Sequence, residues 1–166
     1  MKSNKMLLSL FLLIPAMIFI PACDRDDHDH GHEDMERVNI IDRTQTARPV
    51  IATWTRANGW NKNVLYELSV SAEENRTRVS LGVEVFNDHN EKIELCRDCD
   101  YKIRYWTAQG APQGIIDLSY DEDLLFHGDH VHIYGLALGE TQIEFLLWHG
   151  DHADAATTPV TFRVVE

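Results

Sequence analysis

The sequence predicts an all-β fold, an antiparallel β-sandwich, and two observations support this prediction. From about residue 37 onward, apolar and polar residues alternate in short blocks, and a period of two is the pattern of strands with one buried face. Turn-forming stretches separate these blocks at the spacing of about 8–12 residues that is typical of sandwiches and barrels. No window shows the apolar stripe of an amphipathic helix.

The expected strands follow one another from residue 38 to the end of the chain. The first blocks are "VNIID", "PVIATWT", "LYELSVSA" and "RVSLGVEVF", with the turn formers "NGWN" and "EENR" among them. "KIELC" follows the turn "NDHNE", and "YKIRYWTA" and "GIIDLSY" flank the turn "QGAPQG". "HVHIYGLAL", "TQIEFLLW" and "PVTFRVVE" continue the alternation to the C-terminus.

The C-terminal part, "GLALGETQIEFLLW" followed by "TPVTFRVVE", resembles the closing strands of bacterial immunoglobulin-like domains of the group 2 type. The resemblance covers roughly residues 65–166 and implies an immunoglobulin-like β-sandwich, which we expect to span residues 37–166. It implies a fold and not an activity. The matching positions are Gly135, Gly139, Thr141, Ile143, Val160, Phe162 and Val164.

The first 22 residues have the layout of a bacterial export signal. Two lysines precede the apolar run "MLLSLFLLIPAMIFI", and small residues follow it. The sequence from Ile20 to Cys23 resembles a lipobox, which implies a signal peptide of residues 1–22 and a lipid on Cys23. An ordinary signal peptide or an uncleaved anchor are the alternatives. Lipidation would make this an exported protein anchored to a bacterial membrane, facing the periplasm or the cell surface.

Residues 23–36 are acidic and rich in histidine, and we expect them to form a disordered tether. The formal net charge of the chain is −12, and so acidic a protein repels phosphate backbones and anionic headgroups. Nucleic acid is therefore excluded as a partner and cations are favoured. Weak, rapidly exchanging metal sites are expected in the tether at His28, His30 and His32.

Cys96 and Cys99 are the only cysteines after Cys23. In an exported chain, "CRDC" predicts a short-range disulfide between them. A thioredoxin-type redox pair is disfavoured because a strand pattern, "DYKIRYW", follows the motif instead of a helix.

Five of the nine histidines fall between residues 127 and 152, where the letters H-G-D-H occur twice. His130 and His132 are two apart in a predicted strand, so they should point to the same side. Counting outward from a reversal near Gly139, we expect the two H-G-D-H segments to converge at one end of the fold. The predicted metal ligands are His127, His130, His132, His149 and His152, with Asp129 and Asp151 as further ligands or as hydrogen-bond acceptors for the rings.

These observations predict a lipid-anchored, extracytoplasmic metal-binding protein for capture, buffering or delivery, with a metal transporter or receptor as a candidate partner. Zn²⁺ is the first expectation, and Cu²⁺, Ni²⁺ and Co²⁺ suit the same ligands. No nucleophile and base arrangement indicates an enzyme. "GDHVHIYG" is similar to the copper-ligand strand of Cu/Zn superoxide dismutases, which gives a minor alternative. Another is a surface or adhesion module whose incidental histidines accompany exposed contact residues, Trp54, Trp60 and Trp106.

Overall fold

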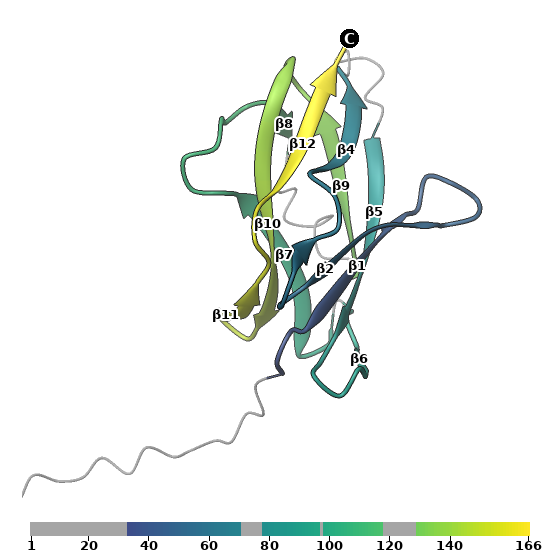
Figure 1. Cartoon of the computed structure of the whole chain (residues 1–166), viewed down its shortest axis with the longest axis vertical. Helices are drawn as coiled ribbons and strands as arrows, with labels where there is room; N and C mark the ends of the chain where they lie inside the picture. Colours follow the sequence, from purple (N-terminus) through teal and green to yellow (C-terminus); the bar gives the residue numbers. More distant parts are fainter. Residues whose placement is uncertain (1–32, 71–77, 97, 118–128) are drawn as a thin grey trace, which may run out of the picture. The chain divides into compact units, whose positions relative to one another are not determined.

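The computed structural model describes residues 33–70, 78–96, 98–117 and 129–166, and these residues form a β-sandwich (Figure 1). Every regular element in these ranges is a strand, and none contains a helix of the length and apolarity that a membrane crossing requires. The strands are β1 (Arg37–Asp42), β2 (Val50–Thr55), β3 (Gly59–Trp60), β4 (Val64–Ser69), β5 (Arg78–Phe86), β6 (Lys92–Ile93), β7 (Tyr101–Thr107), β8 (Ile116–Asp117), β9 (His130–Gly135), β10 (Gly139–His149), β11 (His152–Ala156) and β12 (Val160–Val165).

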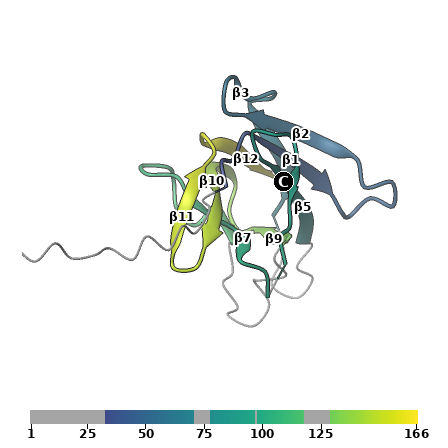
Figure 2. The same ribbon diagram turned by 90° about the horizontal axis from the view of Figure 1, so that it is seen from below.

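The strands are divided between two sheets. One sheet has the order β3-β2-β1-β5-β9-β8, with β6 also paired to β5. The other has the order β11-β10-β12-β4, with β7 also paired to β10. All pairs of named strands are antiparallel except β4 with β12. Figure 2 shows β7, β10 and β11 on one side and β1, β2 and β5 on the other. The predicted antiparallel β-sandwich is confirmed.

Alternating residues of both sheets fill the space between them, as the sequence pattern predicted. In β9 the buried residues are Val131 and Ile133, and in β10 they include Ile143, Phe145 and Leu147. Phe162 of β12 is also fully buried. The two sheets approach closely at Gly135, where an added Cβ would lie 2.7 Å from the carbonyl oxygen of Ser69. Glycine is required there because no side chain fits.

The predicted tether of residues 23–36 is too long at its C-terminal end. Met35 is fully buried in the core, and the amide of Glu36 donates to the carbonyl of Phe86 at 2.9 Å. Arg56 forms ion pairs with Asp34 at 2.9 Å and with Glu36 at 3.0 Å. The apolar methionine explains this docking, since burying such a side chain contributes roughly 1.5–3 kcal/mol.

Two of the three tryptophans expected as exposed contact residues are not exposed. Trp54 is 4% exposed, and its indole N–H donates to Thr158 Oγ1 at 3.1 Å. Trp60 packs against Phe145 with ring centroids 5.8 Å apart. Only Trp106, at 42%, is among the exposed large hydrophobic residues that the structure describes. Aromatic residues of a sandwich pack in its core when their alternating positions face inward.

The sequence also missed two strands, β3 and β11, and misplaced one hairpin. β9 and β10 follow one another in the chain but belong to different sheets. The residues counted as level across Gly139 are therefore not paired with one another. Convergence of the two segments at one end of the fold was expected for strands in opposite sheets as well. Instead β10 pairs with β11, β12 and β7.

Candidate metal centre

A tight hairpin joins β10 to β11 at the second H-G-D-H segment. His149 pairs with His152 across the two strands, which leaves a two-residue loop of Gly150 and Asp151. Gly150 has a φ of 55°, a left-handed conformation that glycine adopts without strain and that is required at the first loop position of a type II′ turn. The indole N–H of Trp148 donates to the carbonyl of Gly150 at 3.0 Å. Side chains paired across an antiparallel ladder point to the same side, so the turn brings the two imidazoles together.

A β-bulge adds a carboxylate to this pair. Leu147 pairs with Ala155 and Trp148 pairs with Ala153, so Asp154 is an extra residue in β11. A bulge re-aims the side chain of the extra residue. Here the carboxylate of Asp154 lies against both imidazoles. We call the three residues the hairpin cluster: His149, His152 and Asp154.

The hairpin cluster has the dimensions of a metal site. Each residue offers one ligand atom, and these atoms lie within 4.8 Å of one another. Asp154 Oδ2 is 3.6 Å from His149 Nδ1, and Asp154 Oδ1 is 3.0 Å from His152 Nε2. Zn²⁺ with bonds of about 2.0–2.1 Å would hold tetrahedral ligand atoms about 3.4 Å apart. Two imidazoles and a carboxylate are also donors that Zn²⁺ accepts. The arrangement can therefore hold one divalent ion.

The hairpin cluster is buried at its base and open at its rim. The side chain of Asp154 is only 2% exposed, that of His149 is 18% exposed and that of His152 is 53% exposed. The rings of His149 and Tyr101 are stacked, with centroids 4.7 Å apart and planes at 29°. Solvent can therefore reach a bound ion from the side of His152.

The loop aspartate sets the protonation of His152. His152 Nδ1 is 3.0 Å from Asp151 Oδ1. This hydrogen bond is the main reason why the pKa of His152 is raised, and the charge of Asp154 adds to the effect. The same hydrogen bond lowers the pKa of Asp151. Asp151 therefore holds the ring by Nδ1 and leaves Nε2 facing Asp154, which is the role of a carboxylate that orients a metal-binding histidine.

The structure does not bring the two predicted histidine pairs into one cluster. His130 and His132 do share one side of β9, with ring centroids 5.1 Å apart. That side is opposite to the buried Val131 and Ile133, and β9 lies in the other sheet from β10. Within the described ranges, the only group of three or more candidate ligand residues is the hairpin cluster, so His130 and His132 are not part of it.

Asp129 is held in a different way from Asp151. Its Oδ1 is 2.8 Å from His130 Nδ1, and its Oδ2 is 3.1 Å from Nη1 of Arg43. Burial opposes ionisation of Asp129, but the hydrogen bond to His130 and the charge of Arg43 outweigh it, so its pKa is lowered. Asp129 thus pairs with Arg43, which lies in the loop between β1 and β2. Several predicted positions lie outside the described residues: Cys23, His28, His30, His32 and His127.

Sequence reasoning missed Asp154, although a signal for it was present. Gly-Asp between two histidines is a two-residue hairpin signal, and it predicts a strand from His152 in which every second residue shares a side. The alanine-rich "HADAA" concealed that strand, because alanine and aspartate are uncommon in strands.

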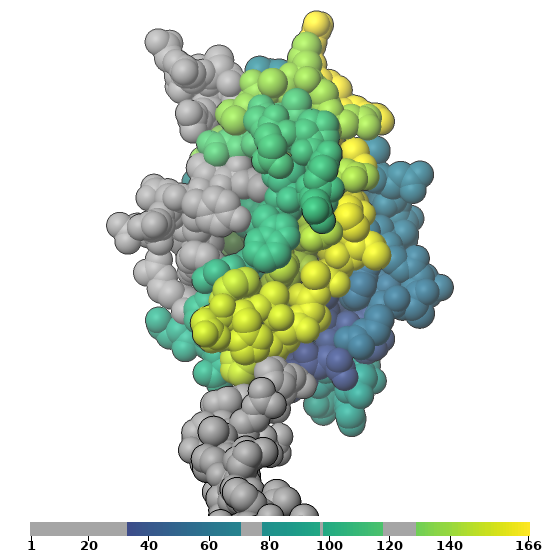
Figure 3. Space-filling model, turned by 90° about the vertical axis from the view of Figure 1, so that its left-hand side faces the viewer, coloured from purple at the N-terminus to yellow at the C-terminus, as the bar shows by residue number. Residues whose placement is uncertain are grey.

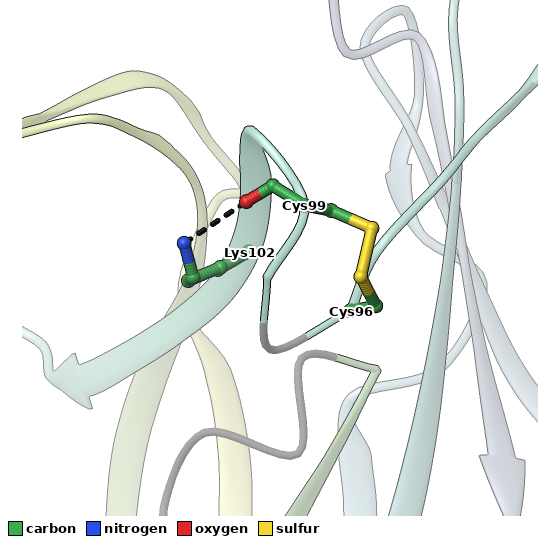
Figure 4. The surroundings of a disulfide bond; sticks show 3 residues. All are labelled: Cys96, Cys99 and Lys102. Atoms are coloured by element: carbon green, nitrogen blue, oxygen red, sulfur yellow. Dashed lines mark hydrogen bonds between the residues drawn. A yellow bond between two sulfur atoms is a disulfide. The ribbon is translucent and has the colours of Figure 1, made fainter.

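The predicted disulfide between Cys96 and Cys99 is present in the structure, with Cα atoms 5.0 Å apart (Figure 4). The ammonium group of Lys102 donates to the carbonyl of Cys99 at 2.9 Å. The closed loop leads directly into β7, whose first residue is Tyr101. It therefore restrains the chain that places the Tyr101 ring on His149.

The chain matches no family model, no curated protein and no solved structure.

Proposed function

We propose that this chain is a lipid-anchored, extracytoplasmic metal-binding protein that captures, buffers or delivers a divalent ion. The single observation that supports the proposal best is the hairpin cluster, in which two imidazoles and a buried carboxylate face one another. Zn²⁺ is the proposed ion, because two imidazole nitrogens and one carboxylate oxygen are ligands that suit it. Cu²⁺, Ni²⁺ and Co²⁺ are competitors that nitrogen ligands also bind.

The ion would replace a proton in the hairpin cluster. His152 Nε2 and Asp154 Oδ1 are 3.0 Å apart, so the two form an ion pair when the ring carries its second proton. A histidine ligand must lose that proton, and the raised pKa of His152 makes the exchange dependent on pH. Such a site takes up its ion at neutral pH and releases it in acid, as a buffering or delivery protein requires.

A Zn²⁺ titration of the chelator-treated full-length chain tests the proposal. We expect about one ion per chain from the hairpin cluster and, at 100 times the Kd, about 2.7 kcal/mol of added stability. For a chain of this size, that raises the Tm by about 5–10 °C. The double substitution His149→Ala and His152→Ala should abolish this effect. Absence of both uptake and Tm shift in the wild-type chain would contradict the metal function.

The matched control removes the other histidine pair. His130→Ala with His132→Ala deletes the same number of imidazoles but leaves the hairpin cluster intact, so Zn²⁺ affinity should stay within about twofold. If this variant loses the ion and the hairpin variant keeps it, the ion belongs to β9. Superoxide dismutase activity, the alternative that His130 and His132 suggested, is tested by a superoxide assay on the copper-loaded chain.

The lipid anchor has its own test. Metabolic labelling with a radioactive fatty acid should mark the wild-type chain in a bacterial host and should not mark Cys23→Ser. The unlabelled variant should also leave the membrane fraction. Equal labelling of the two chains would rule out Cys23 as the lipidated residue.

A further inference from the structure

We propose that a hollow beside β5 binds a small organic monocarboxylate, and that Arg48 is the residue that takes its carboxylate. We call this site the Gly82 hollow. Its volume is about 430 Å³, within the range of about 300–1,000 Å³ that is usual for small-molecule sites. Residues of β5, of β6 and of the loop between β1 and β2 line it, among them Gly82, Ile93, Leu95, Arg43 and Arg48.

Gly82 leaves room for the hollow because it has no side chain. It lies in β5 between Leu81 and Val83, whose side chains are buried in the core, so its own position faces away from the core. An added Cβ would lie 3.0 Å from Cδ of Arg43 and 3.5 Å from Cβ of Ile41. The stem of Arg43 and the side chain of Ile41 therefore offer apolar surface beside Gly82 to the body of a ligand.

The buried Asp42 holds the loop that carries both arginines. Asp42 is only 1% exposed, and its carboxylate accepts hydrogen bonds from the amide and hydroxyl of Thr44, the side-chain amide of Gln45 and the hydroxyl of Tyr66. The amide of Asp42 donates to the carbonyl of Pro49 at 3.0 Å, which closes the other end of the loop. A loop held in this way loses little conformational freedom when a ligand binds to it.

Arg48 has a backbone conformation that favours glycine. Its φ is 45°, and its N–H donates to the carbonyl of Gln45 at 3.0 Å, so it closes a tight turn. A residue with a side chain is strained in this left-handed region, and such strain gathers at binding sites. Glycine would suit the turn better, so the presence of arginine favours a role for the guanidinium at the hollow.

Arg48 is also the cation of the lining that is available to a ligand. Arg43 is paired with Asp129 at 3.1 Å, and Lys92 is paired with Glu84 at 2.7 Å. Arg48 forms no ion pair with a residue that the structure describes. A guanidinium binds a carboxylate through two parallel hydrogen bonds, so a carboxylate is the group that Arg48 recognises.

Glu94 and the apolar residues restrict the ligand further. Glu94 lines the same hollow, and its charge opposes a second negative charge on the ligand. A monocarboxylate therefore fits better than a dicarboxylate or inorganic phosphate. Ile93 and Leu95 add apolar surface to that of Ile41, so the carboxylate should be attached to an apolar body.

The Gly82 hollow is separate from the hairpin cluster. Figure 3 shows the side of the molecule with the hairpin of β10 and β11, where β11 is yellow. The strands that line the hollow, β5 and β6, belong to the other sheet. The proposal therefore goes beyond the metal function and does not depend on it.

The test uses benzoate as the probe and benzamide as its uncharged analogue, with the chelator-treated full-length chain in a non-ionic detergent. Two-dimensional NMR should show saturable shifts of the amides of Gly82 and Leu95 with benzoate, with a Kd on the order of 1 mM for so small a ligand. Benzamide should bind about tenfold more weakly, because it lacks the charge that strengthens the hydrogen bonds to Arg48. Inorganic phosphate should also bind more weakly than benzoate.

Three variants identify the residues that recognise the charge. Arg48→Gly removes the guanidinium and suits the turn, so it should weaken benzoate binding by at least about tenfold without lowering the Tm. The matched control is Arg78→Ala, which removes an exposed arginine of β5 that does not line the hollow, and it should keep the affinity within about twofold. Glu94→Gln should strengthen benzoate binding by about twofold, since it removes an exposed like charge.

The other outcomes would overturn the proposal. Benzamide binding as tightly as benzoate, or Arg48→Gly binding benzoate as tightly as the wild type, would show that Arg48 does not take a carboxylate. Equal losses in Arg48→Gly and Arg78→Ala would attribute the binding to net charge. Arg48→Asn, which also tolerates the left-handed conformation, repeats the test with a second side chain. Zn²⁺ uptake enters none of these outcomes, so the metal function is tested separately.

Discussion

The second H-G-D-H segment and the described half of the first, Asp129 and His130, lie in different surroundings. In the second segment, Gly150 and Asp151 are the loop of a tight hairpin, and the flanking histidines face each other. In the first segment, Asp129 precedes the first residue of a strand, and its partners are Arg43 and His130. The second segment builds a cluster that can hold an ion. In the first, the described Asp129 links Arg43, after β1, to His130 of β9, and both strands belong to the sheet that does not contain β10.

The difference shows that strand pairing, and not the motif, decides which side chains meet. His149 and His152 converge because β11 pairs with β10 and because a bulge turns Asp154 toward them. His130 is paired with Gly82 of β5, which has no side chain to contribute. The stem of Arg43 passes over Gly82 instead, where an added Cβ would lie 3.0 Å from it. The Asp-His pair of each segment therefore meets different neighbours.

The largest expected difference in Zn²⁺ affinity is between substitutions of Asp154 and of Asp129. We expect Asp154→Asn to weaken Zn²⁺ binding by at least about 100-fold. Losing a carboxylate that binds the ion directly lowers the affinity more than losing a residue that only orients a ligand. Asp129→Asn should change the affinity for Zn²⁺ by less than about threefold, because Asp129 is not part of the hairpin cluster. Isothermal titration of both variants measures the contrast, and equal losses would contradict the separation of the two segments.

A second prediction concerns the hairpin turn. Gly150→Ala forces a side chain into a left-handed conformation, which costs about 1–2 kcal/mol, and thermal unfolding without metal should show the loss. Gly114→Ala is a matched control, since Gly114 has a φ of 73° and an added Cβ there also meets nothing within 4 Å. Both variants should lose stability, and only Gly150→Ala should also lose Zn²⁺ affinity. Loss of affinity in both would indicate a general defect.

The pH dependence of Zn²⁺ binding tests the role of Asp151, the aspartate in the loop of the hairpin. The hydrogen bond from Asp151 raises the pKa of His152, so protons compete with the ion at a higher pH than for an ordinary histidine. Affinity should fall as the pH drops through that raised pKa. Asp151→Asn should move the midpoint of this fall to lower pH, as followed by competition titrations between about pH 5 and 8.

The adjacent pair of Asp88 and His89 provides the control for that prediction. Asp88 also raises the pKa of the histidine that follows it, through a hydrogen bond and its charge, but neither residue belongs to the hairpin cluster. Asp88→Asn should leave the midpoint unchanged. A shift of the same size in both variants would show that overall charge, and not the local hydrogen bond, controls binding.

The smallest expected effect is at Arg43. Its ion pair with Asp129 is partly exposed, with side chains 27% and 48% accessible, and such pairs contribute about 0.2–1 kcal/mol. Arg43→Met keeps much of the stem over Gly82 and removes the charge. We expect a slightly lower Tm and an unchanged Zn²⁺ affinity, and a lost affinity would connect the first segment to the ion.

Most of the fold was predictable because its signal is local. Alternation in segments such as "RVSLGVEVF" and "TPVTFRVVE" predicted β5 and β12, which have the expected burial. The short strand β3 and the alanine-rich β11 were missed, because neither has enough apolar residues to show a period. Met35 was missed for the same reason, as a single apolar residue in an acidic segment.

The site was predictable only in part. His149 and His152 were identified within the repeated H-G-D-H motif, and Asp151 was expected either to bind the ion or to accept a hydrogen bond from a ring. Its Oδ1 lies 3.0 Å from His152 Nδ1. Asp154 was not identified, because the alanine-rich "HADAA" hid the strand that the Gly-Asp turn predicts. The bulge that re-aims its carboxylate is set by the pairing of β11 with β10. The stacking of Tyr101 on His149 depends on the pairing of β7 with β10, which joins residues far apart in the chain.

By itself the sequence determined the β-sandwich, the disulfide and the histidine-rich character of the chain, because periodicity, turn residues and spacing are properties of neighbouring residues. Only the tertiary structure decided which histidines meet. The neighbours of a side chain depend on which strand pairs with its own strand and in which register. That pairing depends on burying the apolar faces of both sheets together. For this reason His130 lies against Asp129, which Arg43 also binds, and His149 lies against His152 and Asp154.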